Sequence, residues 1–404
     1  MEDFLTIEDI DVTGKTVLLR GDFNVPLDKQ SGQITEQRRL EAALPTIEYL
    51  LLKNAKVIAC SHMGRPKGEK VPALSLKIVA DKFSQLVDNP VKFVDDCIGG
   101  KADKAKSELN PGEMLILENL RFYPQEKAND VNFSQQLAGG IDIYVNDAFG
   151  TAHRAHASTV GVANIFKEKG LSLAGFLMIK EIKYLSAAIK HYTRPVIAIL
   201  GGSKIKGKIE LIENFSSFVD SLLIGGGMVY TFLKAQGYNI GKSILDEDSI
   251  PVARNILSHI GREAKVNFII SADSITAEQI KEHADCQVYQ NDEIPDQAIG
   301  VDIGPLTVKI FKQAIENAKT IIWNGPMGIF EIDCFAEGTR QVAQAVARAT
   351  DQGALSILGG GDTEAAVAKF DMEDEFSHIS TGGGASLEYM SGRSLPALQA
   401  LNSR

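Results

Sequence analysis

Short apolar runs alternate with longer amphipathic stretches along the whole of this 404-residue chain, and this alternation restricts the fold more than any other feature. A strand–helix–strand order of this kind favours parallel sheets covered by helices on both faces. Ligands of such sheets bind beyond the carboxyl ends of the strands. We expect buried strands at Thr16–Arg20, Lys56–Cys60, Met114–Leu117, Asp142–Val145, Val196–Leu200, Ser221–Ile224, Phe268–Ile270, Thr320–Trp323 and Leu355–Leu358.

The length and one mid-chain stripe indicate two domains. At roughly 100–200 residues per domain, a chain of this size contains two. Apolar residues then recur at intervals of 4, 3 and 4 positions from Met178 to Ile189, which draws one stripe on a helix. Pro195 opens a new strand after it. We therefore expect a helix over residues 178–191 that connects two α/β domains.

The bulk composition excludes several classes of function. A formal net charge of −10 argues against binding to nucleic acid or to an anionic membrane surface. The four cysteines form no C-x-x-C pair, which predicts neither a zinc site nor a disulfide framework and fits a reducing cytoplasm. The start, "MEDFLTIEDI", is acidic and lacks a secretory core, and no apolar run reaches the length of a membrane span.

Cationic side chains follow the predicted strands in the first half. Arginine pairs with carboxylate or phosphate through two hydrogen bonds, so several such loops at one sheet edge would hold a small, multiply charged anion. Each of these residues could equally be a surface charge, and only one of the adjacent Arg38 and Arg39 can face a site. His153 and His156 could be structural. The candidates are Asp22, Asn24, Arg38, Arg39, His62, Arg65, Lys67, Arg121, His153, Arg154 and His156.

Glycine follows the predicted strands in the second half. Glycine triplets stand at residues 225–227, 359–361 and 382–384, and a doublet at 201–202. Glycine lets backbone N–H groups face a phosphate closely, and the last triplet precedes a predicted helix, whose N-terminus attracts anions. The G-x-G-x-x-G fingerprint of dinucleotide-binding proteins is absent.

The segment "LGGSKIKGKIE", residues 200–210, nearly matches the phosphate-binding P-loop, but Ile209 stands where that motif has Ser or Thr. Lys204 and Lys208 would face the phosphates, so a metal must be held elsewhere. Asp362 in "LGGGDTEAA" is the candidate, because magnesium takes one or two carboxylates plus phosphate oxygens. Asp362 could instead cap a helix. Glu331 in "WNGPMGIFE" could bind ribose hydroxyls or be solvated.

Ten segments together resemble the phosphoglycerate kinase family, in the family's order and over almost the entire chain. Ser203 and Gly207 depart from the family's usual Ala and Asp, and Met63 replaces Leu or Phe. The segments are "RGDFNVPLD", "SHMGRP", "LENLRF", "VNDAFGTAHRAHAS", "GGSKIKGKI", "LIGGGM", "DIGPLT", "WNGPMGIFE", "LGGGDT" and "STGGGAS".

The resemblance implies two Rossmann-like α/β domains, each a parallel sheet covered by helices, joined by a helix across a cleft. Residues 1–177 would bind phosphoglycerate, 178–191 form the hinge helix, 192–389 bind the nucleotide, and 390–404 pack back on the first domain. The implied enzyme is a cytoplasmic, monomeric kinase of glycolysis. It transfers a phosphoryl group reversibly from 1,3-bisphosphoglycerate to ADP with Mg²⁺, through domain closure and without a general base.

The resemblance also assigns residues. Arg39 and Lys204 would stabilise the transferring phosphoryl group, Asp362 would bind the metal, and the backbone of Gly383 and Gly384 would bind that group. The phosphoglycerate site would comprise Asp22, Phe23, Asn24, Arg39, His62, Met63, Gly64, Arg65, Arg121 and Arg154. The nucleotide site would comprise Lys204, Lys208, Gly225, Gly304, Asn324, Glu331, Gly360, Gly361, Asp362 and Thr363.

Two other functions remain open from the sequence. A dehydrogenase would share the fold class but needs a dinucleotide fingerprint. A regulatory, anion-binding protein could keep the fold without activity, although Arg39, Lys204 and Asp362 are all present.

Overall fold

A computed structural model describes residues 4–28, 30–260 and 266–404. The chain forms two compact units: residues up to Lys183 together with Ser394–Arg404 make the first, and Tyr184–Arg393 make the second. In the described part of the chain, no helix is both long and apolar enough to cross a membrane.

The first unit is built on a six-stranded parallel sheet in the order β3-β4-β2-β1-β5-β6. Its elements are β1 (Thr16–Arg20), α1 (Arg38–Leu52), β2 (Lys56–Cys60), α2 (Lys77–Leu86), β3 (Val91–Val94), α3 (Gly99–Ser107), β4 (Met114–Leu117), α4 (Pro124–Lys127), α5 (Val131–Ala138), β5 (Ile143–Asn146), α6 (Val162–Lys167), β6 (Ser172–Ala174) and α15 (Pro396–Gln399).

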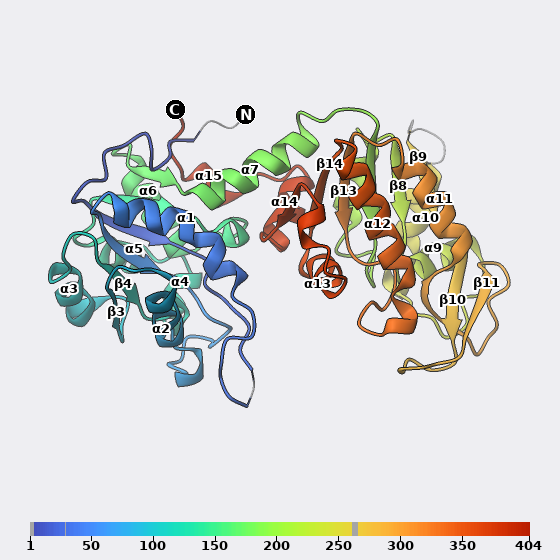
Figure 1. Cartoon of the computed structure of the whole chain (residues 1–404), viewed down its shortest axis with the longest axis horizontal. Helices are drawn as coiled ribbons and strands as arrows, with labels where there is room; N and C mark the ends of the chain where they lie inside the picture. The colour runs from blue at the N-terminus through green and yellow to red at the C-terminus, as the bar shows by residue number, and fades with distance from the viewer. Residues whose placement is uncertain (1–3, 29, 261–265) are drawn as a thin grey trace. The chain divides into compact units, whose positions relative to one another are not determined.

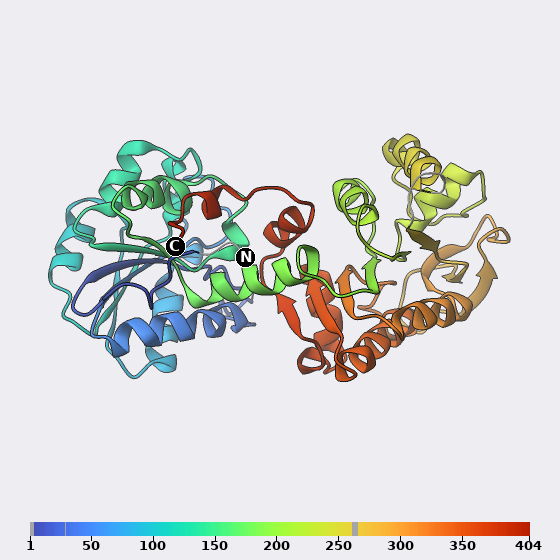
Figure 2. The same cartoon turned by 90° about the horizontal axis from the view of Figure 1, so that it is seen from above.

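Two hydrophobic cores lie on the two faces of this sheet. Side chains alternate between the faces of a strand. Val17 and Leu19 of β1 therefore lie in one buried cluster with residues of α1 and α2, and Leu18 lies in another with residues of α5 and α6. Figure 2 shows α1 on one side of the sheet and α5 and α6 on the other.

The second unit has a parallel sheet in the order β15-β14-β13-β7-β8-β9. Helices α11 and α12 pack together on one of its faces, while α8 and α10 lie on the other side (Figures 1 and 2). Its elements are β7 (Val196–Leu200), α8 (Ile209–Ser216), β8 (Ser221–Ile224), α9 (Val229–Gln236), α10 (Ile250–Ile260), β9 (Asn267–Ile270), β10 (Asp273–Ala277), β11 (Cys286–Gln290), β12 (Ile299–Ile303), α11 (Pro305–Ile315), β13 (Thr320–Asn324), α12 (Glu337–Asp351), β14 (Leu355–Gly359), α13 (Gly361–Lys369), β15 (His378–Ser380) and α14 (Gly384–Met390).

The expectation of one parallel sheet per domain is incomplete for the second unit. Strands β10, β11 and β12 form a separate antiparallel sheet in the order β11-β10-β12. Its strands were not expected from the sequence, because none of them is an apolar run: β11 exposes much of its surface, and the buried β10 (DSITA) and β12 (IGVDI) are interrupted by polar residues and glycine. The sheet supplies residues to the pocket described below.

Helix α7 (Phe176–Ile189) joins the two units, and its bounds differ from the expected 178–191. It begins earlier because Phe176 N–H donates to Thr46 Oγ1 (2.9 Å) and Met178 N–H to Asp147 Oδ1 (3.0 Å), which satisfies its first turn. It ends earlier because the N–H groups of residues 190 and 191 both return to the Ser186 carbonyl.

The last residues of the chain belong to the first unit. Ala397 N–H donates to the Ala152 carbonyl (3.1 Å), and Asn402 N–H donates to the Ser172 carbonyl (2.9 Å). Helix α15 thus continues the first unit although its residues come last in the sequence.

Candidate functional site

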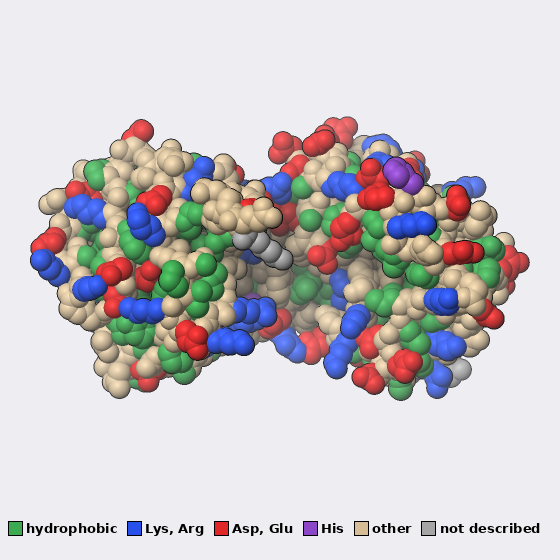
Figure 3. All heavy atoms as spheres, turned by 90° about the horizontal axis from the view of Figure 1, so that it is seen from below, with side chains coloured by type: hydrophobic (Ala, Val, Ile, Leu, Met, Phe, Trp, Pro, Cys, Tyr) green, Lys and Arg blue, Asp and Glu red, His purple; other side chains and the backbone are tan. Residues whose placement is uncertain are grey.

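The carboxyl edge of the first sheet gathers the cationic segments. Strands β4, β2, β1 and β5 are neighbours, and each is followed within seven positions by a residue that the sequence analysis selected. Figure 3 shows acidic and basic side chains interspersed over the face that it draws. The candidates at this edge are mostly basic, because Arg39, Arg65, Arg121 and Arg154 accompany one acid, Asp22. They concentrate positive charge locally in a chain of net charge −10.

Arg39 and Asp22 form the ion pair at the centre of this edge. Arg39, in the first turn of α1, donates from Nη1 to Asp22 Oδ2 at 2.8 Å, and the two side chains are 34% and 11% exposed. The other oxygen, Asp22 Oδ1, is buried and has no hydrogen-bond partner among the residues that the structure describes. Of the two adjacent arginines, Arg39 is the one that reaches Asp22.

The loop after β2 is held by two of the other candidates. Gly64 N–H donates to Asn24 Oδ1 (2.8 Å), and Arg121 Nη1 donates to the Gly64 carbonyl (2.8 Å). Gly64 has a φ of +60°, and a Cβ there would lie 2.8 Å from Leu74, so the turn requires glycine. The structure therefore brings Asn24, Gly64 and Arg121 together.

Arg121 presents an unused donor. Its Nε is buried and has no hydrogen-bond partner in the described part of the chain. Burial, followed by the charge of Arg20, lowers the pKa of Arg121 to about 10, so the guanidinium stays charged near neutral pH. A buried donor without a partner costs free energy, which an anionic ligand would recover.

His62 lies against a fully buried arginine that the sequence analysis did not select. Arg20, 1% exposed at the end of β1, has Nη2 3.2 Å from His62 Nδ1 and donates from Nε to Ser158 Oγ at 2.9 Å. Burial, then the charges of Arg20 and Arg121, hold the pKa of His62 well below its usual value. His62 is therefore neutral near pH 7.

Arg65 and Arg154 stand at the exposed rim of this edge. Arg65 makes no ion pair or hydrogen bond with the described residues, whereas Arg154 Nε donates to His153 Nε2 at 2.9 Å. The charge of Arg154 acts on the pKa of Arg121, which places it near the cluster. His156 is buried, and burial followed by Arg20 lowers its pKa to about 4, in line with a structural role.

The side chains of Phe23 and Met63, two residues that the resemblance assigned to the phosphoglycerate site, do not face that site. Both are buried in the hydrophobic core, and the ring of Phe23 packs on Phe83 with centroids 5.0 Å apart. Alternation along the extended chain turns them away from the polar neighbours Asp22 and His62. Only their backbone could contact a ligand.

Glycines in the second unit let loops contact one another. The loops after β7, β8 and β13 join through Gly202 N–H to the Pro326 carbonyl (2.9 Å) and Met228 N–H to the Gly202 carbonyl (3.0 Å). A Cβ on Gly226 (φ +68°) would lie 2.5 Å from the Gly202 nitrogen. Part of the glycine pattern is therefore explained by loop packing rather than by a ligand.

A pocket of about 450 Å³ opens at these loops. The antiparallel sheet supplies part of its lining, including the buried acid Asp302. Of the expected nucleotide residues it includes Glu331 and Asp362. Its lining also includes Gly202, Ser203, Gly226, Gly227, Tyr230, Lys242, Ile244, Ser271, Ser274, Gly300, Met327 and Gly328.

Two lysines differ in their surroundings beside this pocket. Lys208 directly precedes α8, and its Nζ donates to the side-chain and backbone oxygens of Asn324, whose own amide donates to the Gly359 carbonyl (2.6 Å). Burial lowers the pKa of Lys208 to about 8, and the negative charge of Asp362 offsets part of this shift by raising the pKa. Lys204 is exposed and makes no ion pair or hydrogen bond with the described residues.

Asp362 is not a helix cap, which was the alternative interpretation. The capping position of α13 is Gly360, and no side chain caps that helix. Asp362 lies exposed in the first turn at the edge of the pocket. Within the described residues, no group of three or more His, Cys, Asp or Glu side chains could hold a metal ion by itself.

Other expected nucleotide residues have structural contacts. The Thr363 hydroxyl accepts from Gly325 N–H (2.7 Å) and donates to the Gly359 carbonyl (2.8 Å), which ties two loops together. Gly225 and Gly304 do not line the pocket. A Cβ on Gly225 would lie 2.4 Å from Met327 Sδ, and one on Gly304 2.2 Å from the Asp273 carboxyl carbon. Gly361, Gly383 and Gly384 stand at the starts of α13 and α14.

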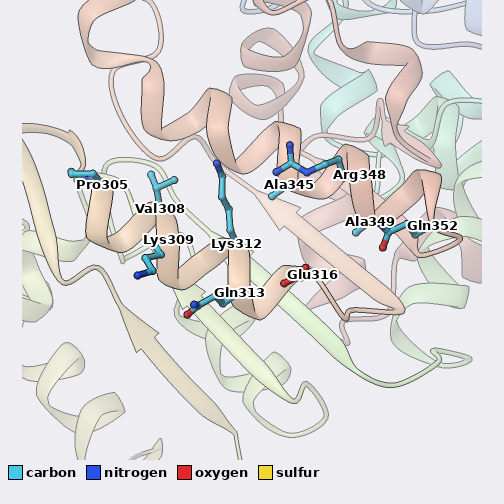
Figure 4. Close-up of a pocket in the computed structure, with 10 residues that line it drawn as sticks. All are labelled: Pro305, Val308, Lys309, Lys312, Gln313, Glu316, Ala345, Arg348, Ala349 and Gln352. Atoms are coloured by element: carbon cyan, nitrogen blue, oxygen red, sulfur yellow. The ribbon is translucent and has the colours of Figure 1, made fainter.

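A second pocket of about 550 Å³ lies between α11 and α12 (Figure 4). Its lining mixes Lys309, Lys312 and Arg348 with Glu316 and small apolar side chains, and Lys312 reaches across to Gln341. It contains none of the residues selected from the sequence and none of the glycine loops. We therefore do not regard it as the active site.

Several residues that shape the two sites were missed from the sequence. Arg20 precedes Asp22 by two positions, so its place at the end of β1 was a usable signal. Asn119 forms hydrogen bonds with backbone atoms of Met63, Leu74 and Arg121. It lies inside "LENLRF", one of the segments that carry the family resemblance. Asp302 likewise begins the segment "DIGPLT", whereas Tyr230 gave no sequence signal, because its role depends on the antiparallel sheet.

Known proteins match the chain over nearly its full length. The family model described as "Phosphoglycerate kinase" matches residues 7–393. Curated proteins named phosphoglycerate kinase are 48% identical over 397 residues (Chloroherpeton thalassium, 98% of either chain) and 50% identical over 400 residues (Dictyoglomus turgidum, 99% of this chain and 98% of the relative). A solved phosphoglycerate kinase from Coxiella burnetii superposes with a TM-score of 0.87 at 39% identity, covering 98% of each chain. The chain belongs to the phosphoglycerate kinase family.

Proposed function

We propose that this chain catalyses the reversible transfer of a phosphoryl group from 1,3-bisphosphoglycerate to ADP, which gives 3-phosphoglycerate and ATP, and that its two units divide the ligands. The observation that carries the proposal is the family match over residues 7–393. The cationic edge in one unit and the glycine-loop pocket in the other support the division of ligands.

The first unit would bind the three-carbon acid. Arg121 offers a buried Nε without a partner, and Arg65 and Arg154 offer exposed guanidinium groups at the rim. Forked guanidinium donors suit phosphate and carboxylate groups. Asn24 and Gly64 would set the shape of the loop, and His62 would contact a substrate oxygen.

The second unit would bind the nucleotide in the 450 Å³ pocket. Lys204 and Lys208 would face the phosphates, and Glu331 would accept hydrogen bonds from ribose hydroxyls. The backbone of Gly360, Gly361, Gly383 and Gly384 would approach the phosphates at the starts of α13 and α14, whereas Asn324 and Thr363 would hold the loops in place.

Magnesium fits this site through the nucleotide rather than through a cluster of protein ligands. Mg²⁺ is commonly bound by one or two carboxylates plus substrate phosphates and water. Asp362 is a solvent-accessible carboxylate at the pocket edge, within electrostatic range of Lys208. Bound there, the ion would neutralise phosphate charge.

Catalysis would consist of positioning and charge stabilisation. The attacking phosphate or carboxylate oxygen is already ionised, so no general base is needed. Arg39 and Lys204 would stabilise the transferring group as it leaves one oxygen and bonds to the other. Because both ligands must meet for transfer, we propose a closing motion, with α7 (Phe176–Ile189) as the hinge element. A cytoplasmic location and a monomeric state are part of this proposal.

A coupled assay tests the proposed reaction. The purified chain is given 3-phosphoglycerate and MgATP, and 1,3-bisphosphoglycerate is reduced with NADH by an excess of a second enzyme, so that NADH absorbance falls. We expect turnover that needs both substrates and that stops when EDTA removes magnesium. A chain that binds both ligands without turnover would instead be an anion-binding protein.

A separate measurement distinguishes the proposed kinase from a dehydrogenase. The pocket of a dehydrogenase would bind NADH and change the fluorescence of that cofactor. We expect no change in NADH fluorescence on titration with the chain, since the pocket lacks the dinucleotide fingerprint.

A further inference from the structure

A directed chain of buried hydrogen bonds runs below the cationic edge of the first unit. Glu126, 1% exposed, accepts from Ser158 Oγ–H at 2.6 Å through one carboxylate oxygen and from Ser158 N–H at 2.9 Å through the other. With its hydroxyl hydrogen used in this way, Ser158 Oγ can only accept from Arg20 Nε–H, which lies 2.9 Å away.

Arg20 then fixes the proton of His62. A guanidinium carries five N–H donors and no acceptor, and the Arg20 Nη2 atom lies 3.2 Å from His62 Nδ1. His62 Nδ1 must therefore be the acceptor and carry no hydrogen. In a neutral imidazole the hydrogen then resides on Nε2.

Two alternatives fit the surroundings less well. An imidazolium could donate from Nδ1 to Asp22 Oδ1, but these atoms are 3.9 Å apart, which is beyond hydrogen-bond distance. It would also set two donors, His62 Nδ1–H and Arg20 Nη2–H, against each other. A ring turned over would place a carbon atom against Arg20 and leave a buried guanidinium N–H unpaired.

The other nitrogen of His62 has no protein partner. Nε2 makes no hydrogen bond within residues 4–28, 30–260 and 266–404, although the side chain is only 6% exposed. A nearly buried donor without a partner beside Asp22, Arg39 and Arg121 indicates a ligand atom at this position.

We propose that Glu126, Ser158 and Arg20 are positioning residues that hold His62 as a neutral imidazole with its hydrogen on Nε2, and that this N–H donates to an oxygen of the three-carbon acid. This inference rests on the proposed function for the identity of the acid. It separates the neighbouring groups by role: the arginines supply charge, while His62 supplies one oriented, neutral hydrogen bond and transfers no proton.

Nitrogen-15 NMR of histidine-labelled protein tests the tautomer directly. The His62 signals among the seven histidines are assigned by their loss in His62→Gln. In the free chain near pH 7 we expect Nδ1 without hydrogen and Nε2 with hydrogen. Hydrogen on Nδ1, or an imidazolium, would overturn the proposal.

Ser158→Ala tests the chain of contacts, and Ser134→Ala is its matched control. Ser134 is a buried serine of the same unit whose hydroxyl donates to the Asp130 carbonyl and takes no part in the hydrogen bonds of this chain. We expect Ser158→Ala to mix the two tautomers and to weaken 3-phosphoglycerate binding by up to about 10-fold, the effect of one hydrogen bond. Ser134→Ala should alter neither.

An unchanged His62 spectrum in a folded Ser158→Ala variant would refute the positioning role. Adding 3-phosphoglycerate to the wild type should shift the Nε2 signal, and a constant signal at saturation would refute the donation. If the chain binds no 3-phosphoglycerate at all, the proposed function fails, and the spectrum of the free chain still decides the tautomer.

Discussion

Replacing Arg39 by alanine separates catalysis from binding and from stability. The side chain donates one charged hydrogen bond to Asp22 at 2.8 Å, and it is one-third exposed. A hydrogen bond to a charged group contributes about 1.5–3 kcal/mol, and the exposure of Arg39 places the pair near 1.5 kcal/mol. Loss of the pair alone would therefore change binding or activity by roughly 10-fold.

Stabilisation of the transferring phosphoryl group by an arginine is far larger, on the order of 1,000-fold or more in kcat. We expect Arg39→Ala to lower kcat by at least this factor, with a smaller rise in the KM for 3-phosphoglycerate. The two effects differ by about 100-fold, so steady-state kinetics in the coupled assay can tell them apart.

The Asp22→Asn background supplies the control. It removes the charge that Arg39 neutralises. In this background Arg39→Ala should cost less unfolding free energy in urea, by about 1.5 kcal/mol, because the pair is already broken. The loss of kcat should persist. An unchanged kcat with a raised KM would refute the catalytic assignment and leave Arg39 as a ground-state binding residue.

Three other perturbations follow from the second unit and from the proposed motion. Gly226→Ala should weaken nucleotide binding strongly, because the added Cβ would lie 2.5 Å from the nitrogen of Gly202, which also lines the pocket. Gly237→Ala is the control, because Gly237 also has a positive φ (+95°) but has no atom within 4 Å of the added Cβ. This control should lose only about 1 kcal/mol of stability in a urea melt and keep its Kd for the nucleotide. Burial raises the pKa of Asp302 from 3.8 to about 8, so the folded state favours the protonated acid. The stability of the wild type relative to Asp302→Asn should accordingly fall as the pH rises from 5 to 8, by at most on the order of 5 kcal/mol, and parallel pH profiles of the two proteins would contradict the shift. Small-angle scattering should show a smaller radius of gyration with 3-phosphoglycerate and a non-reactive ATP analogue together, and identical curves with and without the ligands would count against closure.

The central strands could be predicted from sequence because both of their faces are buried. Such strands are continuous apolar runs, and β1, β2, β4, β7 and β8 have the expected bounds. Three of the strands that were missed, β3, β6 and β15, lie at sheet edges. These three strands are only 3 or 4 residues long, so none of them forms an apolar run that stands out in the sequence.

The candidate site could be predicted in part, because parallel strands bring their carboxyl ends to one edge. This rule placed Asp22, His62 and Arg121 in one cluster. It could not reveal that Phe23 and Met63 point into the core, that Thr363 ties two loops, or that Arg20 is buried below His62. These facts depend on side-chain direction and on contacts between distant segments.

Isothermal titration of two variants with both ligands tests the division of the ligands between the units most directly. Arg121→Met removes the buried donor of the first unit, and Asp362→Asn removes the carboxylate of the second. We expect Arg121→Met to weaken 3-phosphoglycerate at least 10-fold with an unchanged Kd for MgADP, and Asp362→Asn to do the reverse. Variants that each lose both ligands, or that bind both normally, would contradict the account.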